Sequence, residues 1–79
     1  MATTTHLAHN ATRVETTPDA AGRALDIRFA AAMRSIQRGR VSLILLTETS
    51  EAAITPDDAV EIAKQLLKYA QRARRQAQH

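Results

Sequence analysis

The clearest hydrophobic pattern in the chain has a helical period and lies in its C-terminal third. At about 100° per residue, apolar positions fall on one side of the segment that follows Pro56, and mostly basic positions fall on the other. The apolar side comprises Ala59, Ile62, Ala63, Leu66, Leu67, Tyr69, Ala70 and Ala73. Thr55 suits the N-cap, and Pro56 suits the first helical position because its missing N–H would have no intrahelical partner there. The pattern predicts an amphipathic helix over about residues 56–75, with Leu66 and Leu67 in the core.

A continuous apolar run, VSLILLT at residues 41–47, predicts a β-strand. The run is rich in branched residues, is too short for a helix and follows the turn-forming sequence Arg38-Gly39-Arg40. Because Leu43 to Leu46 are consecutive, large apolar side chains would lie on both faces of the strand. Both faces then need cover, so we predict that this strand is central in a small antiparallel sheet.

The segment at residues 18–38 is compatible with two structures. As a helix, it has a cap at Thr17, a proline at its first position and Gly39 just past its end. The apolar stripe of that helix would be Ala21, Leu25, Phe29, Ala32 and Ile36. As strands, a hairpin turn at residues 18–22 would precede an alternating run of Leu25, Ile27, Phe29 and Ala31. The sequence pattern leaves both alternatives open.

Residues 1–17 lack a sustained hydrophobic period. After Met1, only Leu7 and Val14 are large apolar residues, so the segment buries too little surface to offset its ordering entropy. We therefore predict a flexible N-terminal arm over residues 1–17, of which residues 1–12 are dispensable for folding. Residues 14–17 could alternatively add an edge strand. The remainder, residues 18–79, is predicted to form a single small α+β domain, with the antiparallel sheet packed against the C-terminal helix.

The composition limits the core and the ways of stabilising it. A chain of 79 residues forms one small domain, which buries only about 60% of the surface of its unfolded chain. Cysteine is absent, which excludes disulfides, and the only aromatic residues are Phe29 and Tyr69. Small domains with small cores often gain stability from a partner chain, so a homodimer is one expectation.

The chain also lacks the apolar segments that mark membrane or secreted proteins. No run of about 18 apolar residues exists, and the first residues do not contain the apolar stretch of a secretory signal. We expect a cytoplasmic protein that does not enter a membrane.

No group of residues has the pattern that catalysis requires, such as a nucleophile with its base or carboxylates paired in a cleft. The spacing of His6 and His9 could touch a metal ion, but structural sites usually need three or four protein ligands. Asp57, Asp58 and Glu61 are explained by the positive end of the helix dipole. We therefore expect a non-enzymatic protein with no catalytic residues, no metal and no cofactor.

The distribution of charge is more informative than the net charge of +3. Residues 23–40 contain five arginines against one acid, residues 64–79 contain basic residues and no acid, and the segment between is acidic. On the predicted helix, Lys64, Lys68, Arg72 and Arg75 fall opposite the apolar side and form a ridge about 15 Å long. We predict that these four side chains bind a partner. The next candidates are Arg34, Arg38 and Arg40.

Two classes of function are compatible with these features. The first is a non-enzymatic inhibitor or adaptor that occupies the surface of another protein or protein complex. In size and organisation the whole chain resembles the short accessory proteins of phages and mobile elements, among them anti-CRISPR proteins. That resemblance implies a CRISPR effector complex as the target, blocked at its nucleic-acid channel or at a binding subunit. The second class is a small basic nucleic-acid-binding or transcription-regulatory protein, because clustered cations can neutralise phosphates.

Overall fold

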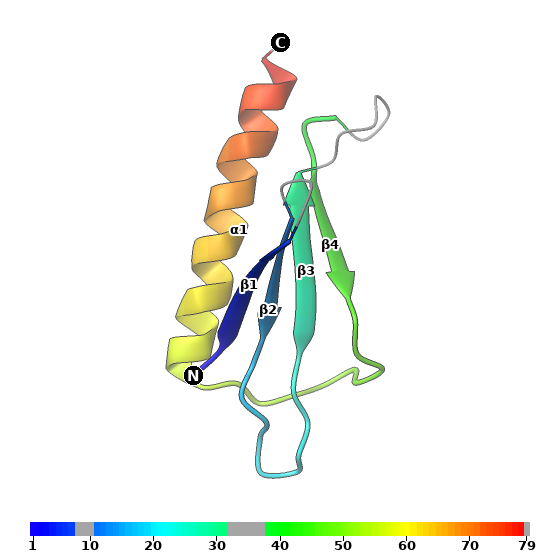
Figure 1. The fold of residues 1–79 in the computed structure, drawn as a ribbon, viewed down its shortest axis with the longest axis vertical. Coiled ribbons are helices and arrows are strands. Elements are labelled where there is room, and N and C mark those ends of the chain that lie inside the picture. The colour runs from blue at the N-terminus through cyan, green and yellow to red at the C-terminus, as the bar shows by residue number, and fades with distance from the viewer. Residues whose placement is uncertain (8–10, 32–37, 79) are drawn as a thin grey trace.

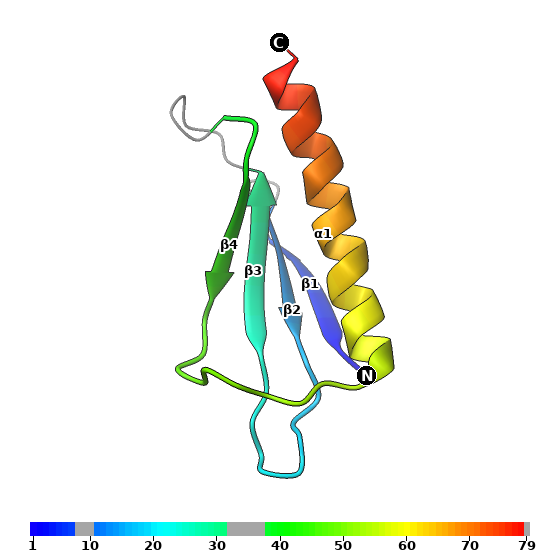
Figure 2. The ribbon, with the colours of Figure 1, turned by 180° about the vertical axis from the view of Figure 1, so that it is seen from behind.

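The computed structural model describes residues 1–7, 11–31 and 38–78. Within them, one antiparallel sheet has the order β1 (Thr3–Leu7), β2 (Ala11–Glu15), β3 (Asp26–Ala31) and β4 (Val41–Leu45), and α1 (Pro56–Ala77) follows. The strands form a meander, and α1 lies across one face of the sheet (Figure 1 and Figure 2). The predicted α+β class, a small antiparallel sheet against a long C-terminal helix, is confirmed.

The core lies on the inner face of the sheet, which is the face that α1 covers. Val14 on β2 and Phe29 on β3 are fully buried. Ile27 and Ala31, two residues before and after Phe29, are buried on the same side of β3. From the helix, Tyr69 packs onto this layer, with its ring centroid 6.4 Å from that of Phe29 and an angle of 10° between the ring planes. Since strand side chains have a period of two, the intervening residues lie on the outer face.

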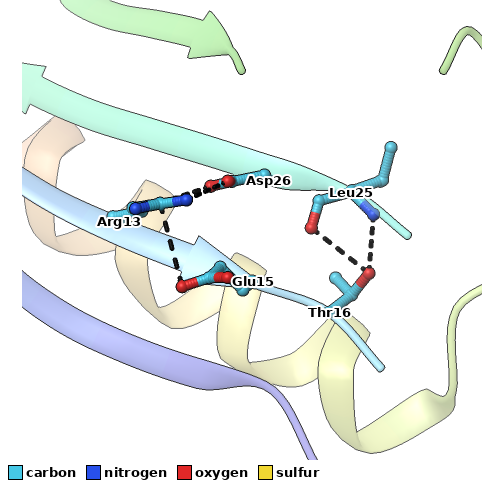
Figure 3. Close-up of polar contacts among 5 residues, drawn as sticks. All are labelled: Arg13, Glu15, Thr16, Leu25 and Asp26. Carbon is cyan, nitrogen blue, oxygen red and sulfur yellow. Dashed lines mark hydrogen bonds and ion pairs between the residues drawn. The ribbon is translucent and has the colours of Figure 1, made fainter. Parts of the chain in front are cut away.

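A turn between β2 and β3 is held by side chains that bond to the backbone. The Asp19 carboxylate accepts a hydrogen bond from the N–H of Ala21 at 2.9 Å, and Gly22 takes a φ of +78°. The Thr16 hydroxyl accepts a hydrogen bond from the N–H of Leu25 at 2.8 Å (Figure 3). An aspartate carboxylate that accepts a hydrogen bond from the N–H two residues later is typical of turns, and so is a glycine at positive φ.

For residues 26–31, the strand alternative is confirmed and the helix alternative is wrong. Ile27, Phe29 and Ala31 are all buried, whereas Arg28 between them is exposed. A helical stripe through Leu25 and Phe29 would have left Ile27 in solvent. Pairing with β2 instead places Ile27 under α1, so tertiary burial outweighs the helix propensity of the alanines. Residues 32–37 lie outside the described residues.

The prediction of a flexible arm over residues 1–17 is wrong, because this segment supplies β1 and β2. β1 and β2 pair antiparallel over five residues each. Thr3 lies opposite Glu15 at one end, and Leu7 lies opposite Ala11 at the other. β2 also pairs with β3 and contributes Val14 to the core. The segment does not need many apolar residues of its own, since the hairpin satisfies its backbone and β3 and α1 supply the apolar surface.

The side of α1 that faces the sheet differs from the predicted one. The buried helix residues are Asp58, Gln65, Tyr69 and Ala73. Leu66 and Leu67, predicted as core, are 41% and 60% exposed. The helix is turned so that Tyr69 reaches Phe29, which leaves the leucines outside. The large destabilisation of about 2–5 kcal/mol that a buried leucine would imply for Leu66→Ala is therefore no longer expected.

The apolar strand is at the edge of the sheet and not at its centre. β4 pairs with β3, as Ile27 with Leu45 and Phe29 with Leu43, and no described strand lies beyond it. The prediction of a central strand rested on apolar residues that need cover on both faces. Four of these, Leu43, Ile44, Leu45 and Leu46, are exposed in this chain.

The start of α1 is as predicted and also ties the helix to the sheet. The Thr55 hydroxyl caps the helix by accepting a hydrogen bond from the N–H of Asp58 at 3.1 Å, and Pro56 follows it. The buried Asp58 carboxylate accepts a hydrogen bond from the N–H of Thr17 at 2.8 Å. That contact, together with the backbone N–H of Ala2, lowers the pKa of Asp58 below its ordinary value of 3.8, although burial opposes the shift.

We expect Asp58→Asn to weaken the response of stability to acid. Because the folded pKa of Asp58 is lowered, its ionised form stabilises the fold above the ordinary value of 3.8, and this contribution is lost as the pH falls through the folded pKa. The variant should be less stable than the wild type at pH 7, and the difference should shrink by about pH 3. Urea unfolding at both pH values measures the difference in the free energy of unfolding between the variant and the wild type. Asp57→Asn, exposed in the same turn, is the control. An unchanged difference at the two pH values would contradict the assigned role.

Candidate functional site

Four basic side chains lie along one side of α1, and we call them the basic surface: Lys64, Lys68, Arg72 and Arg75. Their spacing of three and four residues places them in one row over about 16 Å of the helix axis. Lys64 and Arg75 are exposed, and Lys68 and Arg72 are half-buried. The structure therefore brings the four predicted residues together, but it turns the middle two toward the sheet.

The ring of Tyr69 anchors the middle of the basic surface. Lys68 Nζ lies 5.5 Å and Arg72 Cζ lies 5.0 Å from the ring centroid, within the range in which an aromatic face attracts a cation. The ring itself is fixed by its stacking on Phe29 and by a hydrogen bond of 2.6 Å between the Tyr69 hydroxyl and Thr12 Oγ1. The fold itself thus places both cations beside the ring.

Sequence reasoning missed this role of Tyr69. The helical pattern identified the residue only as part of the core. The available signal was the arginine three residues after the tyrosine, since side chains three apart are neighbours on a helix.

The remaining predicted residues differ in where they lie. Arg38 is exposed and its Nε donates a hydrogen bond of 3.0 Å to the carbonyl oxygen of Gln76, so it lies against the C-terminal end of α1 and outside the row of the basic surface. Gly39 approaches the same end, where a Cβ added to it would lie 3.0 Å from that of Ala77. Arg40 is exposed just before β4. Arg34 lies outside the described residues.

On the outer face of the sheet, by contrast, the charges along β2 are paired. The Arg13 guanidinium on β2 donates a hydrogen bond of 2.7 Å from Nε to Asp26 and forms an ion pair with it (Figure 3). Glu15 lies 3.8 Å from the same Nε. The hydrogen bond to Asp26 is the main reason that the pKa of Arg13 is raised. This face therefore presents little uncompensated charge along β2.

Several acids also have structural roles. The Asp19 carboxylate accepts hydrogen bonds from the N–H groups of Arg23 at 2.9 Å and Ala53 at 3.1 Å. The bond from Arg23 is the main cause that lowers the pKa of Asp19. Asp58 joins α1 to Thr17, as described above. Among the described residues, none of the four side chains of the basic surface forms an ion pair. The fold thus accounts for these acids and leaves the basic surface unpaired.

The described residues offer little that points to other chemistry. A hollow of about 500 Å³ lies beside the turn between β2 and β3, with Thr16, Thr17, Leu25 and Asp26 among its lining residues. In the described ranges, no three His, Cys, Asp or Glu side chains are grouped so as to hold a metal ion. No helix in the same ranges has the length and apolar character needed to cross a membrane. The basic surface is therefore the candidate site.

Comparison of the chain with protein families, with curated proteins and with solved structures finds no match.

Proposed function

We propose that this protein is a non-enzymatic inhibitor or adaptor that binds an acidic surface of another protein through its basic surface. The observation that carries the proposal is the pair of cations held over Tyr69 without an acidic partner among the described residues. Side chains that are already ordered lose less entropy on binding, so their position favours recognition. Arg38 adds a further cation at the C-terminal end of α1, outside the row of the basic surface.

The arrangement favours a protein partner over a nucleic acid. Phe29 and Tyr69 are buried, so neither ring can stack on a base. Exposed acids, Glu48, Glu51 and Asp57, lie before or at the start of α1, away from its basic C-terminal end. An extended phosphate backbone would meet repulsion there, whereas a bounded acidic patch on a protein can contact the basic end alone. Such charge segregation orients a partner and raises its association rate.

A nucleic-acid-binding function remains the second candidate, and one observation favours it. The four cations of the basic surface follow one line over about 16 Å, which a phosphate backbone could track with release of counterions. Affinity of that kind would fall steeply as the salt concentration rises.

The first partner to test is a CRISPR effector complex. The size and organisation of the chain resemble those of anti-CRISPR proteins, and such complexes work in the cytoplasm, where we propose that this protein acts. Binding would block the nucleic-acid channel or a nucleic-acid-binding subunit. The basic surface would then contact acidic residues of the complex.

We expect Arg75→Glu to weaken binding about tenfold or more while it leaves the melting temperature within a few degrees of the wild type. Arg75 is exposed on the basic surface, so reversal of its charge places like charges at the interface without disturbing the core. The matched control is Arg74→Glu, which makes the same charge change at an exposed neighbour that points about 100° away around the helix. Binding is measured with purified CRISPR effector complexes by calorimetry.

A second arm uses random-sequence duplex DNA over a salt series. Salt-sensitive DNA binding that Arg75→Glu abolishes would favour the nucleic-acid candidate over the protein one. Equal losses of protein binding from Arg74→Glu and Arg75→Glu would show that net charge, and not the basic surface, governs the interaction.

A further inference from the structure

The outer edge of β4 carries backbone groups that no described strand satisfies. The N–H of Leu46 donates a hydrogen bond of 2.7 Å to the carbonyl oxygen of Asp26 on β3. In an antiparallel ladder, the backbone groups of successive residues point to opposite sides. The N–H and C=O groups of Leu43 and Leu45 therefore point away from β3, toward the side on which the described sheet ends.

The side chains of this edge are unprotected as well. Leu43 and Leu45 are 52% and 55% exposed, although they share the inner face with Phe29 and Ile27, their partners on β3. No charged residue occurs from Val41 to Thr47. Sheet edges in monomers usually carry charges, prolines or bulges that prevent pairing with another chain. An apolar, uncharged edge strand is instead a template for a further strand.

We propose that the outer edge of β4 pairs with β4 of a second copy of this chain, antiparallel about a two-fold axis at Ile44. This proposal concerns a surface separate from the basic surface. The two sheets would join into one continuous antiparallel sheet. Of the possible occupants, the charges around β4 single out a second copy.

Charge complementarity is the reason for that choice. Arg40 immediately precedes β4 and Glu48 follows it by three residues, and both are exposed. With the axis at Ile44, residues equally far before and after it lie opposite each other. The start of β4 in each copy then lies beside the end of β4 in the other. The exposed Arg40 side chain of one copy is therefore near the bend that carries Glu48 of the other, and opposite charges close together across strands stabilise a pair. The strand is therefore complementary to itself in the antiparallel direction.

The same register satisfies the backbone and the apolar side chains. Leu43 lies opposite Leu45 of the second copy, and the outward-pointing N–H and C=O groups of these two residues form the new hydrogen-bonded pairs. A two-fold axis perpendicular to the sheet keeps the inner faces together, so both α1 helices lie on one side. The inner-face leucines of the two β4 strands meet between the helices. Ile44 faces Ile44 of the other copy on the outer side.

Cysteine cross-linking tests this register directly, because the natural chain has no cysteine. In the pair at the axis the two Cα atoms lie about 4.5 Å apart, within the range that a disulfide spans. Under mild oxidation, Ile44→Cys should form a covalent dimer in most of the protein. Ser42→Cys is the matched control on the same face of the same strand, where the two sulfurs would be too far apart. Failure of Ile44→Cys to cross-link, or equal cross-linking by Ser42→Cys, would overturn the proposal.

Charge exchange supplies a second test with the full chain. By sedimentation equilibrium the wild type should have twice the chain mass of 8.7 kDa. Arg40→Glu alone and Glu48→Arg alone should each raise the dimer dissociation constant about tenfold, since the symmetry repeats the repulsion twice. The double variant should regain most of the affinity. A monomeric wild type, as expected if another protein occupies the edge, or a double variant no better than the single ones, would refute self-pairing.

Discussion

A chain that lacks residues 1–12 is expected to lose its cooperative fold. The deletion removes β1 and the first two residues of β2, including Thr12, which is fully buried and bonds to the Tyr69 hydroxyl. The rest of β2 would lose its partner on one side, and part of the sheet under α1 would be missing. A domain of this size has only a few kcal/mol to lose, at about 0.05–0.15 kcal/mol per residue. Circular dichroism and a urea titration measure the effect.

A side-chain variant in the same segment tests whether the loss of stability comes from the missing strand or from a missing side chain. Thr5 on β1 is exposed, so Thr5→Ala should keep the backbone pairing with Arg13 and melt within a few degrees of the wild type. A truncated chain that still melts cooperatively near the wild-type temperature would restore the interpretation of residues 1–12 as a dispensable arm.

The second large effect is expected for Tyr69→Ala, which should destabilise the fold by about 3–5 kcal/mol, as for other large buried aromatics. The variant removes a ring that is 1% exposed and stacked on Phe29, and it leaves the Thr12 hydroxyl without its bond to the helix. Urea unfolding of this variant should show a much lower midpoint, or no folded baseline at all.

Leu67→Ala is the matched comparison on the same helix. Leu67 is 60% exposed, so its loss should change the free energy of unfolding by about 0.5 kcal/mol or less. If Leu67→Ala were the more damaging of the two, α1 would bury the side predicted from its apolar pattern and not the side that carries Tyr69. The comparison thus tests the rotation of the helix about its own axis.

Part of the candidate site was predictable from the sequence. The alignment of Lys64, Lys68, Arg72 and Arg75 follows from the helical period alone, because a regular helix places residues three or four apart on one side. The position of Arg38 at the end of the helix does not follow from it. Its bond to Gln76 joins residues 38 positions apart, and only the return of the chain through β4 brings them together.

For β4, the sequence predicted the strand correctly but not its place in the sheet. Its apolar sequence predicted a strand, and the structure confirms one at Val41–Leu45. The prediction that it is central assumed that one chain must cover all of its apolar residues. Apolar residues show that cover is needed and do not show which chain supplies it.

The α+β class and the start of the helix could be predicted from the amino-acid sequence. The sequence also predicted the turn before β3, as one of two alternatives. These features depend on local chemistry: the Thr55 cap, the proline after it, and the Asp19 and Gly22 of the turn. The strands Thr3–Leu7 and Ala11–Glu15, the edge position of β4 and the buried side of α1 became clear only from the three-dimensional packing. These depend on contacts between distant residues, such as Thr12 and Tyr69, which are 57 positions apart. Local propensity does not encode which distant partners will meet, and in so small a core a single aromatic contact can turn the helix away from its most apolar side.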